Sequence, residues 1–300
     1  MHSTILSTAD IARLFHVTET TVKRWADEGR LKCQKTPGGH RKFSIRQVVA
    51  FAEENNFEPC GILELSDDLA PKIQMAVVSR DFAQMVDAFV LKSLSPNKTD
   101  LFDYLSYLYE HRIQLGEIFD LVLRPAMGII GERWAAGTLD ISHEHRASHE
   151  TLDALAKLQA QINIKPQNGF VALLACLGEE MHEIGLRCAA YLLESEGWDT
   201  HYLGARTPPS SIVTAIRELR PDLVCLSVTS ADAIRPPHDS LHEIAETIHA
   251  SGGRVFGGGA GVQKGMLPAG VFDAVLASTQ DLLGHHLLPQ PGAARPPAAP

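Results

Sequence analysis

A histidine that lies between a carboxylate and a glycine is the feature of this sequence with the clearest chemical meaning. The segment reads Glu180-Met181-His182-Glu183-Ile184-Gly185. It follows a continuous apolar run, which is typical of a buried parallel strand. Imidazole is a good transition-metal ligand, and a nearby carboxylate can fix its tautomer. Glu180 can supply that carboxylate, with Asp232 or a backbone carbonyl as alternatives, and Gly185 permits close approach of a bulky planar ligand. We therefore predict a metal ligand at His182.

Two further segments are spaced so that they end neighbouring strands. Between Gly185 and Ser227 lie 41 residues, and Ser227 and Thr229 close a predicted strand. After another 27 residues, Gly257 and Gly258 close the next. Ligands of open α/β sheets bind beyond the carboxyl ends of the strands, so these residues are expected to meet the histidine there. A dinucleotide-binding fold is disfavoured because no GxGxxG follows the first strand.

This triple pattern resembles the corrinoid-binding domains of methionine synthase and its relatives, in which Asp-x-His-x-x-Gly is followed by Ser-x-Leu and Gly-Gly. The resemblance implies cobalamin as the cofactor, with His182 as the lower axial cobalt ligand in place of dimethylbenzimidazole. Ser227 would line the slot for the displaced nucleotide tail, and the glycine pair would leave room beside it. Glu180 keeps the carboxylate of the pattern, and Thr229 keeps a β-branched body in place of Leu.

A second constellation precedes this segment. Trp134 is followed, after nine residues, by Glu144 and His145. The spacing resembles the cap bundle of CarH/LitR-type photoreceptors, in which a DNA-binding domain, a four-helix bundle and a cobalamin domain follow in this order. The resemblance implies that the three residues cover the upper face of adenosylcobalamin, whereas the alternative for Trp134 is plain bundle core. Ala135 stands where the family's light switch uses a histidine. The candidates to replace it are His143, His145 and His149.

The N-terminal segment carries the pattern of a nucleic-acid reader. Ser7 and Thr18 can cap two short helices joined by a tight turn, and a Pro-Gly-Gly turn with basic residues follows as a wing. The predicted DNA contacts are Thr20, Thr21, Lys23 and Arg24 on the second helix and His40, Arg41 and Lys42 on the wing. The series resembles the winged-helix domains of the MerR and excisionase type over residues 5–52, with Trp25 and Phe43 as core. The alternative is a helical domain with a solvated basic face. One such domain neutralises few phosphates, so we expect a homo-oligomer, a dimer or tetramer, on operator DNA.

The elements that position these residues follow from periodicity. Helical spacing of apolar residues predicts helices near 71–93, 99–112, 114–136 and 141–162. Strands are expected at 170–177, 200–203, 223–228, 254–256 and 274–276, alternating with helices at 182–196, 208–219, 238–250 and 279–287. The predicted fold class is multidomain α and α/β: a winged helix-turn-helix, a four-helix bundle and a doubly wound, flavodoxin-like parallel sheet. The expected boundaries are 1–57, a linker at 58–70, the bundle at 71–165, the α/β domain at 166–288 and a disordered tail at 289–300.

Charge and composition fit this division. The net charge is −9, but residues 1–57 carry nine Lys and Arg against six Asp and Glu, so the remainder carries the negative charge. The five cysteines are scattered and form no CxxC pair, which favours reduced thiols over a disulfide framework or a zinc site. No membrane-length apolar stretch and no signal peptide are visible, so we expect a cytoplasmic protein.

Three functions compete at this point. The first is a light-responsive transcriptional repressor in which adenosylcobalamin controls oligomerisation and operator binding. The second is a light-independent cobalamin or redox sensor of the same architecture, which Ala135 favours. The third is a corrinoid methyl carrier fused to a regulator. We expect no enzymatic activity, because no substrate or methyl-donor domain is visible in the 300 residues. The Glu144–His145 pair is therefore interpreted as a cofactor contact instead of a general acid–base pair.

Overall fold

A computed structural model describes most of the chain. The described residues are 5–15, 17–36, 38–44, 47, 48, 51, 54, 55, 70–95, 101–230, 238–265, 267 and 270–284. They fall into two compact units: the described residues up to Ile113 with Leu121–Ala147, and Gln114–Asp120 with those from Ser148 onward. Of the predicted linker only residue 70 is described, and the predicted tail at 289–300 lies outside the described residues. Within the described ranges, no helix has both the length and the apolar character to cross a membrane.

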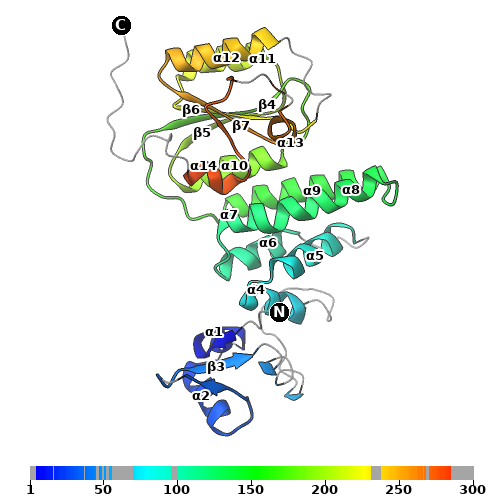
Figure 1. Ribbon diagram of the computed structural model, residues 1–300, viewed down its shortest axis with the longest axis vertical. Coiled ribbons are helices and arrows are strands. Elements are labelled where there is room, and N and C mark those ends of the chain that lie inside the picture. Colours follow the sequence, from blue (N-terminus) through cyan, green and yellow to red (C-terminus); the bar gives the residue numbers. More distant parts are fainter. Residues whose placement is uncertain are drawn as a thin grey trace. The chain divides into compact units, whose positions relative to one another are not determined.

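The N-terminal part of the first unit is a winged helix-turn-helix (Figure 1). Its elements are β1 (Ile5–Ser7), α1 (Thr8–Leu14), α2 (Glu19–Asp27), β2 (Gln34–Lys35) and β3 (Arg41–Ser44). β3 is the central strand of an antiparallel sheet, and the Thr18 hydroxyl caps α2 by accepting from the Thr21 amide at 3.2 Å, as the sequence predicts. Trp25 is 4% exposed and Phe43 fully buried, which confirms both as core. The short strand β1 was not predicted.

The helices after the winged domain differ from the prediction at their start. They are α4 (Ala70–Ser79), α5 (Phe82–Ser93), α6 (Leu101–Glu110), α7 (Leu115–Glu117), the π-helical η1 (Ile118–Leu123), α8 (Arg124–Ala135) and α9 (Ile141–Gln159). The predicted single helix over 71–93 is wrong: Arg80 has a φ of 55°, and the Asp81 side chain caps α5 by accepting from the Gln84 amide at 3.1 Å. An aspartate that bonds the following turn favours a helix start over helix continuation. As a result, Met75 and Val78 of α4 pack against the core of the winged domain.

A buried carboxylate joins η1 to the end of the chain. Asp120 is 3% exposed and accepts hydrogen bonds from the Thr279 amide at 2.8 Å, the Thr279 hydroxyl at 3.0 Å and the Gln280 amide at 3.0 Å. It thereby caps the N-terminus of α14 (Thr279–Gly284), the last described helix. This cap links Gln114–Asp120, which precedes α8 in the chain, to the rest of the second unit.

We expect Asp120→Ala to destabilise the second unit by about 2 kcal/mol, because two backbone amides at the start of α14 lose the carboxylate that caps them. Urea unfolding of the purified protein measures the loss. Asp153→Ala, which removes an exposed carboxylate from α9, is the matched control and should change the free energy of unfolding by less than about 0.5 kcal/mol. Equal stability of the two variants would contradict the cap.

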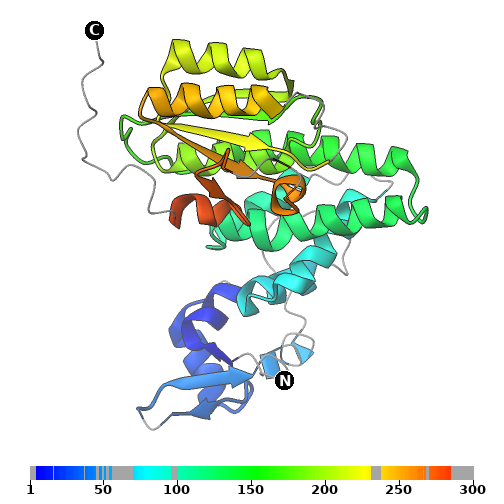
Figure 2. The same cartoon turned by 45° about the horizontal axis from the view of Figure 1, so that its top comes forward.

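The second unit is a doubly wound α/β sheet, as predicted (Figures 1 and 2). Its strands are β4 (Val171–Leu177), β5 (Asp199–Thr207), β6 (Leu223–Ser227), β7 (Arg254–Gly258) and β8 (Ala274–Val275). The helices that connect these strands are α10 (Ile184–Ser195), α11 (Pro209–Leu219), α12 (His238–Ala250) and the short α13 (Ala260–Gln263). The order β5-β4-β6-β7-β8, all parallel, is the flavodoxin-like order, in which the strand sequence reverses on either side of β4.

Both faces of the sheet are covered, which explains the continuous apolar run of β4. Leu173 and Ala175 belong to the core shared with α11 and α12, whereas Leu174 and Cys176 belong to the core shared with α10 and α14. The predicted helix over 182–196 begins only at Ile184, so His182 lies in the loop between β4 and α10. The topology therefore puts this loop and the end of β6 at the switch point where such sheets bind ligands.

Candidate functional site

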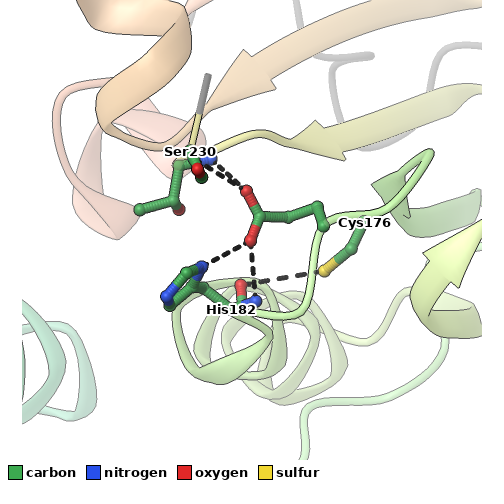
Figure 3. A network of polar contacts seen from close by, with 5 residues as sticks. Cys176, His182 and Ser230 are labelled. Carbon is green, nitrogen blue, oxygen red and sulfur yellow. Dashed lines mark hydrogen bonds and ion pairs between the residues drawn. The ribbon is translucent and has the colours of Figure 1, made fainter. Parts of the chain in front are cut away.

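The His182 side chain is held by Glu180 of the same loop. The imidazole Nδ1 lies 2.5 Å from Glu180 Oε1, and the backbone N–H of His182 donates to the same oxygen at 2.8 Å. Figure 3 shows the imidazole at the rim of the sheet, with the Cys176 thiol donating to the His182 carbonyl oxygen at 3.8 Å. A proton on Nδ1 leaves the lone pair on Nε2, which is the arrangement that a metal-ligating histidine uses. The other sequence candidate for this role, Asp232, lies outside the described residues.

Glu180 is buried and ionised. Its side chain is 1% exposed, whereas that of His182 is 64% exposed. Burial by itself raises the pKa of Glu180, but hydrogen bonds from His182 and from the amides of Ser230 and Thr229 outweigh it and bring the pKa to about 2. The carboxylate is therefore charged at neutral pH and orients an accessible imidazole. Burial raises the pKa of the Cys176 thiol to about 12, so this sulfur is not a thiolate ligand.

The residues predicted at the ends of β6 and β7 lie beside this loop in the sheet order. Ser227 is 7% exposed and pairs with Gly258 across the two strands. A Cβ on Gly258 would have no atom within 4 Å, and the same holds for Gly185 at the start of α10. A Cβ on Gly257, however, would lie 2.9 Å from the ring of Phe272. Gly257 therefore allows packing of that ring, and the open space predicted for a ligand is found beside Gly258.

The three predicted cap residues lie in the first unit, at the turn between α8 and α9. Trp134 is 46% exposed, so the alternative of bundle core is wrong. His145 Nδ1 lies 2.7 Å from Glu144 Oε2, with the histidine 64% and the glutamate 22% exposed. Ala135, the last residue of α8, is exposed as well. Trp134 near the end of α8 and His145 near the start of α9 therefore both have accessible side chains, and Glu144 orients the imidazole.

The predicted DNA contacts divide between a groove and an exposed helix face. A groove of about 660 Å³ separates α2 from the β2–β3 hairpin. Its lining includes Lys23 of α2 and His40, Arg41 and Lys42 of the hairpin. The other predicted contacts are Thr20, Thr21 and Arg24, of which Thr20 is exposed, Thr21 partly buried and Arg24 66% exposed. The Lys23 side chain is 48% exposed and lies 3.5 Å from Glu19.

Arg41 differs from Lys23 and Arg24 in that its ion pair is shorter and its side chain is mostly buried. Its guanidinium donates to both oxygens of Asp27 at 2.7 and 2.9 Å, and its side chain is only 18% exposed. Arg41 therefore fastens the wing to α2, a role that was not predicted because Asp27 is 14 positions away. Lys35 on β2, which is not among the predicted DNA contacts, has a side chain that is 61% exposed and lies 3.9 Å from Asp27.

Comparison with known proteins finds matches for both the winged domain and the part of the chain that contains His182. A helix-turn-helix domain model matches residues 5–56, and two B12 binding domain models match residues 100–159 and 171–284. The HTH-type transcriptional repressor CarH of Myxococcus xanthus is 27% identical over 79% of this chain and 83% of its own length. In its matched domains and over most of its length, this chain is therefore similar to a CarH-type cobalamin-binding regulator.

Two further relatives refine this placement. The HTH-type transcriptional repressor CarA of Myxococcus xanthus is 33% identical to this chain. The aligned region covers 37% of this chain and 38% of CarA. The solved monomethylamine corrinoid protein of Methanosarcina barkeri aligns with a TM-score of 0.55 at 16% identity, covering 67% of this chain and 95% of its own. That second likeness concerns the fold alone.

The residues around His182 in this chain fit a corrinoid. The imidazole of His182 is exposed and oriented for Nε2 ligation by a carboxylate that is 1% exposed. Open space beside Gly185 and Gly258 is what a large planar ligand and its displaced tail require. Within the described residues, no group of three or more His, Cys, Asp or Glu could hold a metal ion.

Substitutions at two neighbouring glycines should distinguish an effect on cofactor binding from an effect on packing. Gly258→Ala should weaken cobalamin binding about 10-fold, since the new methyl enters the open space, with little change in the stability of the apo-protein. Gly257→Ala should lower the free energy of unfolding by about 1–3 kcal/mol, because its methyl overlaps the Phe272 ring. Cobalamin titration and urea unfolding of both variants provide the measurement. The proposed division fails if Gly258→Ala binds cobalamin as the wild type does.

Proposed function

We propose that this chain is a CarH-type, light-responsive transcriptional repressor with adenosylcobalamin bound at His182. The observation that carries the proposal is the exposed imidazole, oriented by buried Glu180, in one chain with a winged domain that has a basic groove. When bound, adenosylcobalamin supplies a cobalt–carbon bond that green light breaks. Trp134, Glu144 and His145 are proposed to cover the upper face of the cofactor, because their side chains remain accessible outside the bundle core.

The DNA-binding state is proposed to be a homo-oligomer. A single winged domain offers few exposed cations, and affinity for a duplex grows with the number of phosphates contacted. A ligand changes such an assembly only if it binds the two states with different affinity. The dark, adenosylcobalamin-bound protein is therefore expected to bind operator DNA, and the illuminated protein to bind it weakly.

The decisive experiment compares one sample before and after green light. Absorbance follows photolysis, sedimentation gives the oligomeric state, and gel shift with DNA from the regulator's own promoter region gives affinity. Loss of DNA binding together with the spectral change supports the light switch. Unchanged DNA affinity after complete photolysis overturns it.

Ala135 favours a second candidate, a light-independent cobalamin or redox sensor. The side chain at this exposed position offers no ligating atom to hold cobalt once an upper ligand leaves. This candidate requires DNA binding to follow cobalamin occupancy, or the identity of the upper ligand, equally in dark and light. The same gel shift with methylcobalamin, hydroxocobalamin and adenosylcobalamin distinguishes the two. Assays with methyl donors test the methyl-carrier alternative, for which we expect no turnover.

A further inference from the structure

The two oxygens of Glu180 have different partners. Oε1 accepts from the ring and the backbone of His182, at 2.5 and 2.8 Å. Oε2 accepts from the consecutive backbone amides of Thr229 and Ser230, at 2.5 and 3.0 Å. Figure 3 shows the resulting network between the loop of His182 and the turn at Ser230, which follows β6. One carboxylate therefore ties together two loops that are about 50 positions apart in sequence.

The backbone of Glu180 is itself held in place. Its N–H donates to the Leu177 carbonyl oxygen at 3.2 Å, and its carbonyl oxygen accepts from the Arg206 amide at 2.8 Å. Arg206 has a φ of 54°, a left-handed conformation at the end of β5 that few residues other than glycine adopt. The Cα of Glu180 is thus fixed between β4 and β5, so the position of its carboxylate depends on the length of its side chain.

Side-chain length decides whether the carboxylate reaches both loops. An aspartate at this position, as in the pattern of the methionine synthase relatives, is shorter by one methylene, or about 1.5 Å. From a fixed Cα, a displacement of that size takes contacts of 2.5–3.0 Å beyond hydrogen-bond range for at least one of the two oxygens. The glutamate and the position of the Thr229–Ser230 turn therefore match each other.

We propose that the Thr229–Ser230 turn is a positioning element for the axial histidine, and that Glu180 must be a glutamate to use it. The two amides hold Oε2, which leaves Oε1 aimed at His182 Nδ1 and sets the direction of Nε2. Thr229 acts here through its backbone N–H and not through the β-branched side chain that the sequence singled out. The inference rests on the proposed cobalamin site for its function, but its structural part concerns the apo-protein.

The test compares Glu180→Asp and Glu180→Gln with the wild type and with Glu179→Asp. Glu179 is the matched control, since its side chain is 56% exposed and contacts Arg206 instead of the network. Hydrogen exchange of the apo-protein reports on the Thr229 and Ser230 amides, with the amides of β4 as the internal reference for folding. Titration with hydroxocobalamin, followed by absorbance, reports histidine ligation of cobalt.

Glu180→Asp is expected to raise exchange at the two amides at least 10-fold, with β4 unchanged, and to weaken cobalamin binding about 10-fold or more. Glu180→Gln should keep part of the amide protection and lose the charge that fixes the imidazole. Wild-type exchange in Glu180→Asp, or faster exchange with unaltered cobalamin binding, overturns the positioning role. Failure of the wild type to bind cobalamin instead overturns the proposed function, and this is seen before any variant is compared.

Discussion

Replacing His182 with alanine is expected to weaken cobalamin binding by about 100-fold or more and to remove the change in the cobalamin spectrum that accompanies replacement of dimethylbenzimidazole by the imidazole. Loss of a residue that merely orients a ligand already reduces metal affinity by about 10- to 100-fold, and His182 is the ligand itself in the proposed site. A role in the core does not account for an imidazole that is 64% exposed at the sheet rim and bonded through Nδ1 to a buried carboxylate.

Absorbance titration of the apo-protein with hydroxocobalamin measures this effect. His201→Ala is the matched control, because His201 is a partly exposed histidine on β5 of the same unit, 3.7 Å from Asp199. It should bind cobalamin as the wild type does. If the spectrum of the His182→Ala complex is that of the wild type, the axial assignment is incorrect.

The double variant Lys23→Ala/Arg24→Ala should lose most of its affinity for duplex DNA at about 0.1–0.2 M salt. The two side chains are 48% and 66% exposed on α2, and neither is buried in an ion pair as Arg41 is. Removing one cation that neutralises a phosphate reduces the slope of log affinity against log salt by about 0.9, so removing the pair should reduce it by about 1.8. Fluorescence anisotropy at several salt concentrations measures both quantities.

The control for this variant removes two exposed cations from the other unit, as Arg217→Ala/Lys264→Ala. It changes net charge by the same amount and should leave the salt slope unchanged. Equal slopes for the two double variants would show that net charge, and not the α2 face, governs DNA binding.

Most of the α/β unit is predictable from sequence because its signals are local. The apolar run of β4 and the β/α alternation indicate the flavodoxin-like order, and the loop of His182 follows from it. Periodicity cannot fix where a helix starts, however, so the expected helix over 182–196 includes His182, which lies two residues before α10. The break at Asp81 escapes prediction for the same reason, since a capping side chain leaves the apolar spacing intact.

The parts of the site that escape prediction are contacts between distant residues. Backbone amides have no sequence signature, so residue types do not reveal the partners of Glu180 after β6. The Arg41–Asp27 pair joins the wing to α2. Which of the acidic residues on or near α2 Arg41 contacts depends on the geometry of the turn between β2 and β3. Phe272 fills the space beside Gly257 for a similar reason: only the fold shows which ring faces which glycine.

The cap of α14 by Asp120 has a consequence for how the chain is made. The two partners are 159 positions apart, so during synthesis Asp120 emerges from the ribosome long before the amides whose hydrogen bonds it accepts. Until residue 279 has been synthesised, the Asp120 carboxylate lacks the three donors that it has in the folded chain. A contact of such sequence separation also closes slowly in refolding, because its loop entropy must be overcome before it contributes. Docking of α14 onto η1 is therefore expected to be a late step in the folding of the second unit.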